Sequence, residues 1–152
     1  IIKCINGMVS WRQIGFIGDT TDNLQLGLFS DADFAGDRAN MRSTSGVFLA
    51  LYGPYSFFPL AAQSKKQTAV SHSIVEAEIV AADHALRASG LPTLPIREHI
   101  LDRQAPLELY QDNQATGRIM HTGRAPALRH IKRTHSVSVA WIHERFRAQM
   151  LI

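Results

Sequence analysis

The order of strand-like and helix-like segments is the feature that most constrains the fold of this chain. Three segments with strand character come first, separated by short turns: residues 24 to about 33, 45–51 and 55–62. The first alternates leucine with other residues, which is the period of a half-buried strand. Short connections favour antiparallel pairing of the three segments. Pro59 inside the third segment predicts an edge position or a bulge.

An alanine-rich helix is predicted next. Ser73 followed by Glu76 matches a capping box, which indicates the start of the helix. Gly90 followed by Pro92 predicts its end, because glycine is favoured just after a helix and proline cannot continue one. This is the strongest helix signal in the chain.

Shorter elements alternate after this helix. We predict, in order, a helix over 95–102, a strand over 107–111, a helix from 112 to about 121, a strand over 128–131 and a helix from about 135. The start of this last segment, 136–139, could equally be a strand. Strands followed by alternating helices and strands require a mixed sheet. The predicted fold class is α/β, with a five-stranded sheet (three antiparallel strands, then two parallel) and helices on both faces.

Composition supports one folded domain. Of 152 residues, 45% are hydrophobic and 19% are charged, which excludes disorder. The single cysteine, Cys4, excludes an internal disulfide, and the longest apolar run, 47–52, has six residues, too few for a membrane span. The chain opens without an initiator methionine, so we interpret residues 1–23 as a connector from an upstream region and 24–152 as the domain.

Basic residues gather near the C-terminal end. Residues 118–147 hold seven basic side chains and one acid, Glu144, a local excess of +6 in a chain of net charge +3. Twelve of the 16 basic residues are arginine, whose planar fork suits phosphate. The alternatives are a solvated basic face and a track for a polyanion, and the bias favours nucleic acid.

The positions of the aspartate and glutamate residues indicate a possible functional site at the ends of the predicted strands. Asp31 and Asp33 share a face at the end of the first strand, where turn hydrogen bonding is the alternative role. Glu76 and Glu78 lie about 200° apart around the helix, so they serve different purposes. Glu76 has a sufficient role in the capping box, whereas the helical neighbours of Glu78 are apolar, so Glu78 needs a partner or a cation. Asp112 is either a helix N-cap or a residue of a site at a strand end.

Asp31, Glu78 and Asp112 would therefore form a cluster of three carboxylates. Such a cluster repels itself unless it holds hard divalent ions, of which Mg²⁺ is the first expectation. Two such ions, about 3.5–4 Å apart, can activate a water molecule and stabilise the leaving oxygen in phosphodiester hydrolysis.

Six short motifs occur in an order that resembles a known family. The chain is similar, over roughly 24–146, to the ribonuclease H domain of copia-type LTR-retrotransposon polyproteins. The motifs are SDADFAGD at 30–37, STSG at 43–46, SKKQT at 64–68, EAE at 76–78, DNQA at 112–115 and HI at 130–131. Each motif alone is weak, but six in the family's order are specific.

This resemblance implies a ribonuclease H-like fold and metal-dependent endonucleolytic hydrolysis of the RNA strand of RNA–DNA hybrids during reverse transcription. Carried over by motif, Asp31, Glu78 and Asp112 are the catalytic metal ligands, holding two Mg²⁺ ions that Mn²⁺ can replace. The implied partners are the hybrid and an upstream reverse transcriptase of the same polyprotein, with no membrane. The implied location is intracellular, in a cytoplasmic particle or the nucleus, and not secreted.

Further residues are expected to contact the nucleic acid. The polar segment before the helix would lie near the substrate backbone, and recognition of the 2′-hydroxyl would select RNA over DNA. The basic C-terminal third would add phosphate contacts. The candidate nucleic-acid-binding residues are Ser64, Lys65, Lys66, Gln67, Arg129, His130 and Arg133.

The chain departs from the family pattern at one position. The family has an aspartate soon after the His-Ile pair, but residues 130–135 read HIKRTH, and no acid follows until Glu144. Alignment places either His135 or Lys132 there. We prefer His135 as the fourth catalytic residue, because histidine can ligate a metal or carry a proton; contact with phosphate is its alternative role.

The missing acid motivates a second hypothesis: a catalytically impaired domain that binds a nucleic-acid duplex or braces the polymerase. A third, an unrelated phosphotransferase, is disfavoured because the sequence has no glycine-rich phosphate loop.

Overall fold

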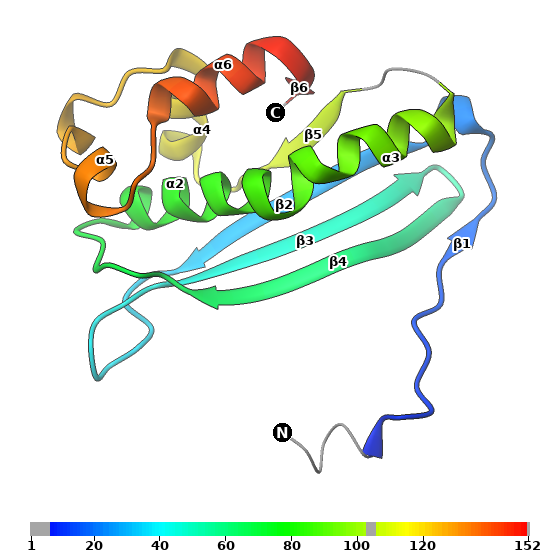
Figure 1. Cartoon of the computed structure of the whole chain (residues 1–152), viewed down its shortest axis with the longest axis horizontal. Coiled ribbons are helices and arrows are strands. Elements are labelled where there is room, and N and C mark those ends of the chain that lie inside the picture. Colours follow the sequence, from blue (N-terminus) through cyan, green and yellow to red (C-terminus); the bar gives the residue numbers. More distant parts are fainter. Residues whose placement is uncertain (1–6, 103–105, 152) are drawn as a thin grey trace.

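A six-stranded sheet forms the centre of the computed structural model, which describes residues 7–102 and 106–151 (Figure 1). The strand order is β1-β4-β3-β2-β5-β6. Strands β2, β3 and β4 pair antiparallel, whereas β5 runs parallel to β2 and β6 parallel to β5. The strands are β1 (Phe16–Ile17), β2 (Gln25–Asp33), β3 (Thr44–Gly53), β4 (Ser56–Lys66), β5 (Leu107–Tyr110) and β6 (Met150–Leu151).

The predicted α/β class and the mixed sheet, three antiparallel strands followed by two parallel ones, are therefore confirmed. The additional strand, β1, pairs with the outer edge of β4. The second parallel strand is β6, at the end of the chain, and not the predicted segment 128–131. That segment contains the end of a 3₁₀ turn, Pro126–Leu128, and the start of a short helix, because Pro126 is preset for the first turn of a helix.

The described helices lie over one face of the sheet (Figure 1). They are α2 (Ile74–Ala85), α3 (Leu91–Leu101), α4 (Gln114–Thr122), α5 (Ile131–Thr134) and α6 (Val139–Gln149). The sequence predicts helices on both faces, and the alternation of β2 explains the difference. Leu26 and Leu28 are buried under the helices, whereas Phe29 on the opposite face is 38% exposed.

One hydrophobic core joins the sheet to the helices. Leu28 of β2 packs in the same cluster as Ile79 of α2, Leu109 of β5 and Ile142 of α6, and all four are fully buried. Burial of each such side chain contributes about 1.5–3 kcal/mol, so this cluster fixes α2 and the ends of the parallel strands relative to each other.

Pro59 lies at a bulge in β4, as the sequence predicts. Ala50 of β3 pairs with Pro59, but the next residue, Leu49, pairs with Ala61, so one residue of β4 is left over. Proline has no N–H to donate to the ladder, and the bulge accommodates that loss.

The long helix does not end at Gly90, contrary to the sequence prediction. A π-helical turn, Leu86–Gly90, connects α2 directly to α3. Gly90 has helical dihedral angles, φ −61° and ψ −65°, so Pro92 falls in the first turn of α3. Proline has no backbone N–H to donate, and the irregular hydrogen-bond spacing of the π-helical turn accommodates that loss. The hydroxyl of Thr93 donates to the carbonyl of Ser89 at 2.7 Å.

The segment before β2 touches the sheet. Asp19 accepts hydrogen bonds from the Tyr55 backbone N–H at 2.8 Å and from the Ser56 hydroxyl at 2.6 Å. The division into a connector and a domain stays a prediction. Within 7–102 and 106–151, no helix combines the length and apolar character needed to cross a bilayer.

Candidate metal centre

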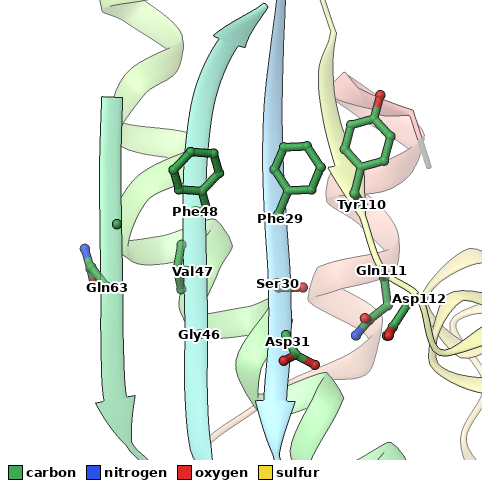
Figure 2. A pocket seen from close by; sticks show the side chains of 11 residues that line it. Phe29, Ser30, Asp31, Gly46, Val47, Phe48, Gln63, Tyr110, Gln111 and Asp112 are labelled. Atoms are coloured by element: carbon green, nitrogen blue, oxygen red, sulfur yellow. The ribbon is translucent and has the colours of Figure 1, made fainter. Parts of the chain in front are cut away.

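A groove opens on the uncovered face of the sheet, where β2 and β5 end (Figure 2). Its volume is about 640 Å³. Phe29, Phe48 and Tyr110 line one part of it, and Asp31 and Asp112 line the other. We call this space the aromatic groove.

Parallel strands bring the two aspartates together. Asp31 lies near the carboxyl end of β2, and Asp112 is the second residue after β5. Phe29 of β2 pairs with Tyr110 of β5, so each aspartate follows its paired aromatic residue by two positions. Sites in such sheets form at the carboxyl ends of the strands, as expected here.

Asn113, and not Asp112, caps helix α4. The Asn113 side chain accepts a hydrogen bond from the Thr116 backbone N–H at 3.0 Å. Asp112 therefore does not have the capping role that was its alternative in the sequence, and its exposed side chain belongs to the strand-end site.

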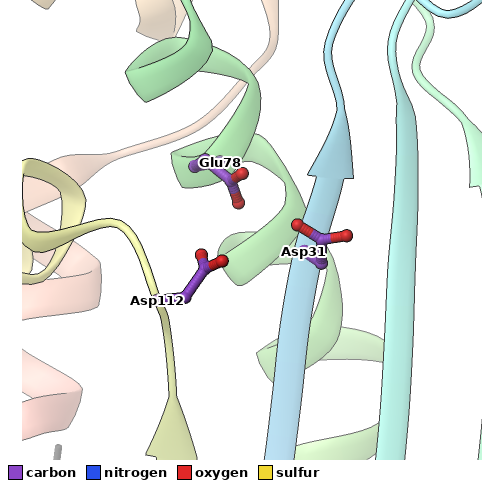
Figure 3. A group of neighbouring side chains, drawn as sticks. All are labelled: Asp31, Glu78 and Asp112. Carbon is purple, nitrogen blue, oxygen red and sulfur yellow. The ribbon is translucent and has the colours of Figure 1, made fainter.

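Helix α2 supplies the third carboxylate. Ser73 caps this helix by accepting from the Glu76 backbone N–H at 3.1 Å, and Glu78 follows in the first turns. Asp31, Glu78 and Asp112 each offer one oxygen, and these oxygens all lie within 4.8 Å of one another (Figure 3). Glu78 is 4% exposed, whereas both aspartates face solvent.

The electrostatics of Glu78 fit a cation site. Burial raises the pKa of Glu78, and the charges of Asp31 and Asp112 raise it further. Hydrogen bonds from the Gln111 side chain and the Ala32 backbone act in the opposite direction without cancelling this rise. A divalent cation would offset both the burial and the repulsion, and an all-oxygen donor set suits Mg²⁺ or Mn²⁺. The residues present therefore fit the expected metal.

Gln111 is a site residue that sequence reasoning missed. Its Nε2 donates to Glu78 Oε2 at 2.9 Å. The available signal was its position, directly before Asp112 at the end of a strand. Alternation alone could not show that its amide reaches across to the helix.

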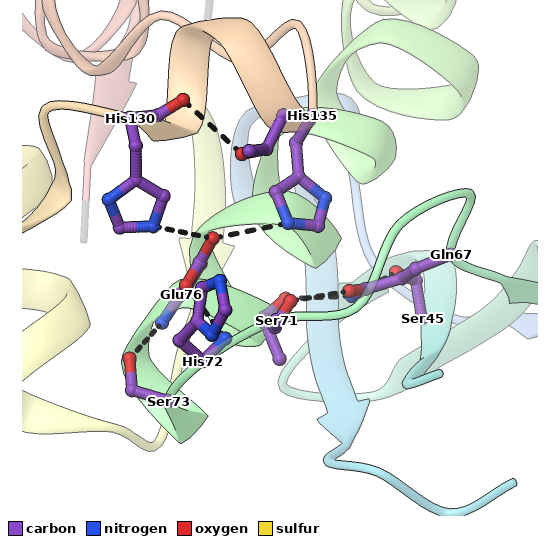
Figure 4. Close-up of polar contacts among 10 residues, drawn as sticks. Ser45, Gln67, Ser71, His72, Ser73, Glu76, His130 and His135 are labelled. Atoms are coloured by element: carbon purple, nitrogen blue, oxygen red, sulfur yellow. Dashed lines mark hydrogen bonds and ion pairs between the residues drawn. The ribbon is translucent and has the colours of Figure 1, made fainter. Parts of the chain in front are cut away.

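Glu76 belongs to a separate cluster (Figure 4). It is fully buried, and its Oε2 accepts from the His72 backbone N–H at 2.8 Å. Its Oε1 lies 3.1 Å from His130 Nε2 and 3.2 Å from His135 Nε2. Burial raises the pKa of Glu76, but the His72 hydrogen bond and the two histidines outweigh it, and the pKa is lowered. The reciprocal bond of the predicted capping box thus goes to His72, and not to Ser73.

His135 lies beside Glu76, with its side chain buried. It is not a member of the three-carboxylate group. The alternative position, Lys132, is exposed on α5. A role for His135 in catalysis stays a prediction.

The candidate nucleic-acid-binding residues occupy two regions. Ser64, Lys65 and Lys66 are exposed near the end of β4, and Lys66 forms an ion pair with Asp37. Gln67 is buried, and its amide donates to Ser45 Oγ at 3.0 Å and to the Ala77 carbonyl at 2.9 Å.

The other candidates surround α5. Arg129 and Arg133 are exposed, whereas His130 is half-buried against Glu76. The two arginines are thus available for phosphate, and the His130 ring already has a protein partner.

The mixed sheet, its strand order and its helices fit the ribonuclease H-like fold that the motifs imply. No family model and no curated protein matches the chain. Among solved structures, it is similar to the RNase H1 of the halophilic archaeon Halobacterium salinarum NRC-1. The TM-score is 0.48 and the sequence identity is 14%, over 84% of this chain and 83% of that chain.

Proposed function

We propose that this chain is a metal-dependent endonuclease that hydrolyses the RNA strand of RNA–DNA hybrids during reverse transcription of a retrotransposon. The observation that carries the proposal is the convergence of Asp31, Glu78 and Asp112 from β2, α2 and the end of β5. The six motifs in family order supply the substrate class. The site lies on an open groove, where a polymer can reach it.

The three carboxylates have unequal roles in this proposal. Glu78 is buried and held by Gln111, so it supplies a fixed anchor. Asp31 and Asp112 are exposed and face the groove, so they lie closest to an incoming phosphate. Two divalent ions bound there would supply activation of water and stabilisation of the leaving oxygen.

Basic side chains would hold the duplex beside the site. Arg129 and Arg133 are exposed on the segment that His130 fastens to α2 through Glu76. Arginine binds phosphate with its planar fork, so these residues would bind phosphates of the nucleic-acid backbone. The proposal includes an upstream reverse transcriptase, joined through residues 1–23, and an intracellular location.

The test is hydrolysis of an end-labelled RNA–DNA hybrid by the full chain, with Mg²⁺ or Mn²⁺. We expect cleavage of the RNA strand in the hybrid and not of RNA alone or duplex DNA. Asp112→Asn is the control, because it keeps the shape of the side chain and removes its charge. Failure of well-folded protein to cleave in either metal would refute the proposal.

A specific observation favours the second candidate, an impaired domain that binds duplexes or braces the polymerase. Among the described residues the acidic group has three members, and His135 is engaged with Glu76. If hybrid binding persists while Mg²⁺ and Mn²⁺ change neither cleavage nor melting temperature, this second function replaces the first.

A further inference from the structure

The uncovered face of the sheet carries a band of exposed aromatic rings. Phe29 is 38% exposed, Tyr110 41% and Phe57 53%, and Phe48 lies between Phe29 and Phe57. Large apolar side chains that gather on an open surface mark a place where a partner binds.

The rings and the carboxylates share one space. The aromatic groove runs from Phe29, Phe48 and Tyr110 to Asp31 and Asp112 without interruption (Figure 2). A ligand atom at the carboxylates would therefore place the next part of the same ligand over the rings.

Small residues keep the groove open between its two parts. Gly46, which pairs with Asp31, and Ala62, which pairs with Phe48, both line it. A Cβ on Gly46 would have its nearest neighbour, the Asp31 carbonyl oxygen, at 3.8 Å, so this position is uncrowded.

The rings are held in place before any ligand binds. Phe29 and Tyr110 are stacked, with centroids 4.6 Å apart and planes inclined by 11°. The Tyr110 hydroxyl donates to Glu108 at 2.7 Å, and Tyr52 contacts the same carboxylate. Because these rings are already ordered, stacking on them costs little additional side-chain entropy.

We propose that the aromatic groove binds unpaired nucleotides next to the scissile phosphate, so that the preferred substrate is a hybrid that adjoins a single strand. This inference rests on the proposed nuclease function and names its substrate more closely. Within a duplex the faces of the bases are covered by their neighbours. Unpaired bases expose both faces, so they are the nucleotides best able to stack on Phe29, Phe48 and Tyr110.

The charge of the groove agrees with stacking as the source of affinity. Among the described residues, no lysine or arginine lines it. Phosphates would find no cationic partner over the rings, whereas every base has a face that can stack on an aromatic side chain. A folded protein over the rings would also cover Asp31 and Asp112, which the nuclease proposal requires to be open.

The experiment measures affinity without cleavage. The full chain is titrated, with Ca²⁺ in place of Mg²⁺, against a fluorescent blunt hybrid and against the same hybrid with a four-nucleotide single-stranded extension. We expect the extension to lower Kd by about tenfold, in line with one stacked base. Phe29→Leu and Tyr110→Leu should remove most of this gain, and Tyr110→Phe should retain it because the ring stays.

Phe57→Leu is the matched control. Phe57 lies on the same face and is more exposed than Phe29, but it does not line the aromatic groove. The gain from the extension should be unchanged in this variant. Melting temperatures establish that all four variants are folded.

Several outcomes would overturn the inference. They are equal affinities for the blunt and extended hybrids, a gain that survives both leucine variants in the groove, and a gain lost equally in Phe57→Leu. A concentration-dependent dimer that the groove variants abolish would show instead that a second copy of the chain covers the rings. Absence of cleavage with an intact affinity gain would refute the nuclease function alone.

Discussion

Glu76 and Glu78 lie two positions apart on α2, and their carboxylates belong to different clusters. Glu76 Oε1 lies 3.1 Å from His130 Nε2, whereas Glu78 Oε2 accepts from Gln111 at 2.9 Å. The helix turns by about 100° per residue, so neighbours at this spacing diverge. Substitution of one should affect stability, and substitution of the other should affect metal binding.

Glu76→Gln should lower the free energy of unfolding by about 2–3 kcal/mol. Glutamine removes the buried charge that accepts from the His72 backbone N–H and lies beside His130 and His135, and weakening a buried, charge-assisted contact has a cost of this size. Urea denaturation at pH 7 measures the change. A double-mutant cycle with His135→Leu should give a coupling of about 1 kcal/mol, and strict additivity would contradict the contact.

Glu78→Gln should have the opposite effect on the metal-free chain. The variant removes a buried charge that Asp31 and Asp112 repel, so the melting temperature in EDTA should rise. The increase in melting temperature on adding Mn²⁺ should disappear at the same time. Calorimetry with and without Mn²⁺ compares the two proteins, and an undiminished Mn²⁺ response in the variant would exclude Glu78 as a ligand.

Asp83 should make the stability depend on pH. Burial raises the pKa of Asp83, and the ion pair with Arg87, at 2.9 Å, offsets only part of this rise. Folding thus favours the protonated form. The stability from Asp83 is complete below its unfolded pKa of about 3.8 and is lost as the pH rises through the higher folded pKa.

Asp83→Asn removes this titration and keeps a hydrogen-bond acceptor for Arg87. The stability of the original chain minus that of the variant should therefore fall between pH 4 and pH 7. Urea midpoints at several pH values give the difference, and a flat profile would show that Asp83 has an ordinary pKa in the folded state.

Arg133→Gln should weaken hybrid binding in a salt-dependent way. Each phosphate that a cation neutralises adds about 0.9 to the slope of log K against log salt concentration, so the slope should fall by about one unit. Arg12→Gln is the control, since Arg12 is also exposed but lies before β1. Equal slopes for Arg133→Gln and the original chain would remove Arg133 from the phosphate contacts.

Gly90→Ala should destabilise the chain, and Gly117→Ala should stabilise it. A Cβ at Gly90 would lie 2.8 Å from the methyl carbons of Leu28 and Leu107, both fully buried. The overpacking cost of about 1–3 kcal/mol exceeds the helix gain. Gly117 in α4 has no atom within 4 Å of such a Cβ, so alanine should gain about 0.5–1 kcal/mol. Thermal unfolding of both variants checks the opposite signs.

Local patterns predicted several elements, including strand β2 of the candidate metal centre. The leucine alternation located β2, and Pro59 located the bulge in β4, because strand period and missing N–H groups are properties of short segments. The convergence of Asp31 and Asp112 followed from a general property of parallel strands, whose carboxyl ends meet at one edge.

The elements that were missed depend on contacts between distant segments. Gly90 and Pro92 read as a helix end, yet packing of Gly90 against Leu28 and Leu107 favours continuation through a π-helical turn. Glu76 lies beside two histidines, His130 and His135, which are more than fifty positions further along the chain. No local spacing shows that contact.

The continuous path of α2, the π-helical turn and α3 runs from the candidate metal centre along the sheet to the far end of α3 (Figure 1). From Ile74 to Leu101 the rod is about 40 Å long, and Glu78 sits near its beginning. The spacing of the three carboxylates therefore depends on how firmly the whole rod rests on the sheet. Loosening α3 at its far end would change the angle at which the Glu78 carboxylate faces Asp31 and Asp112.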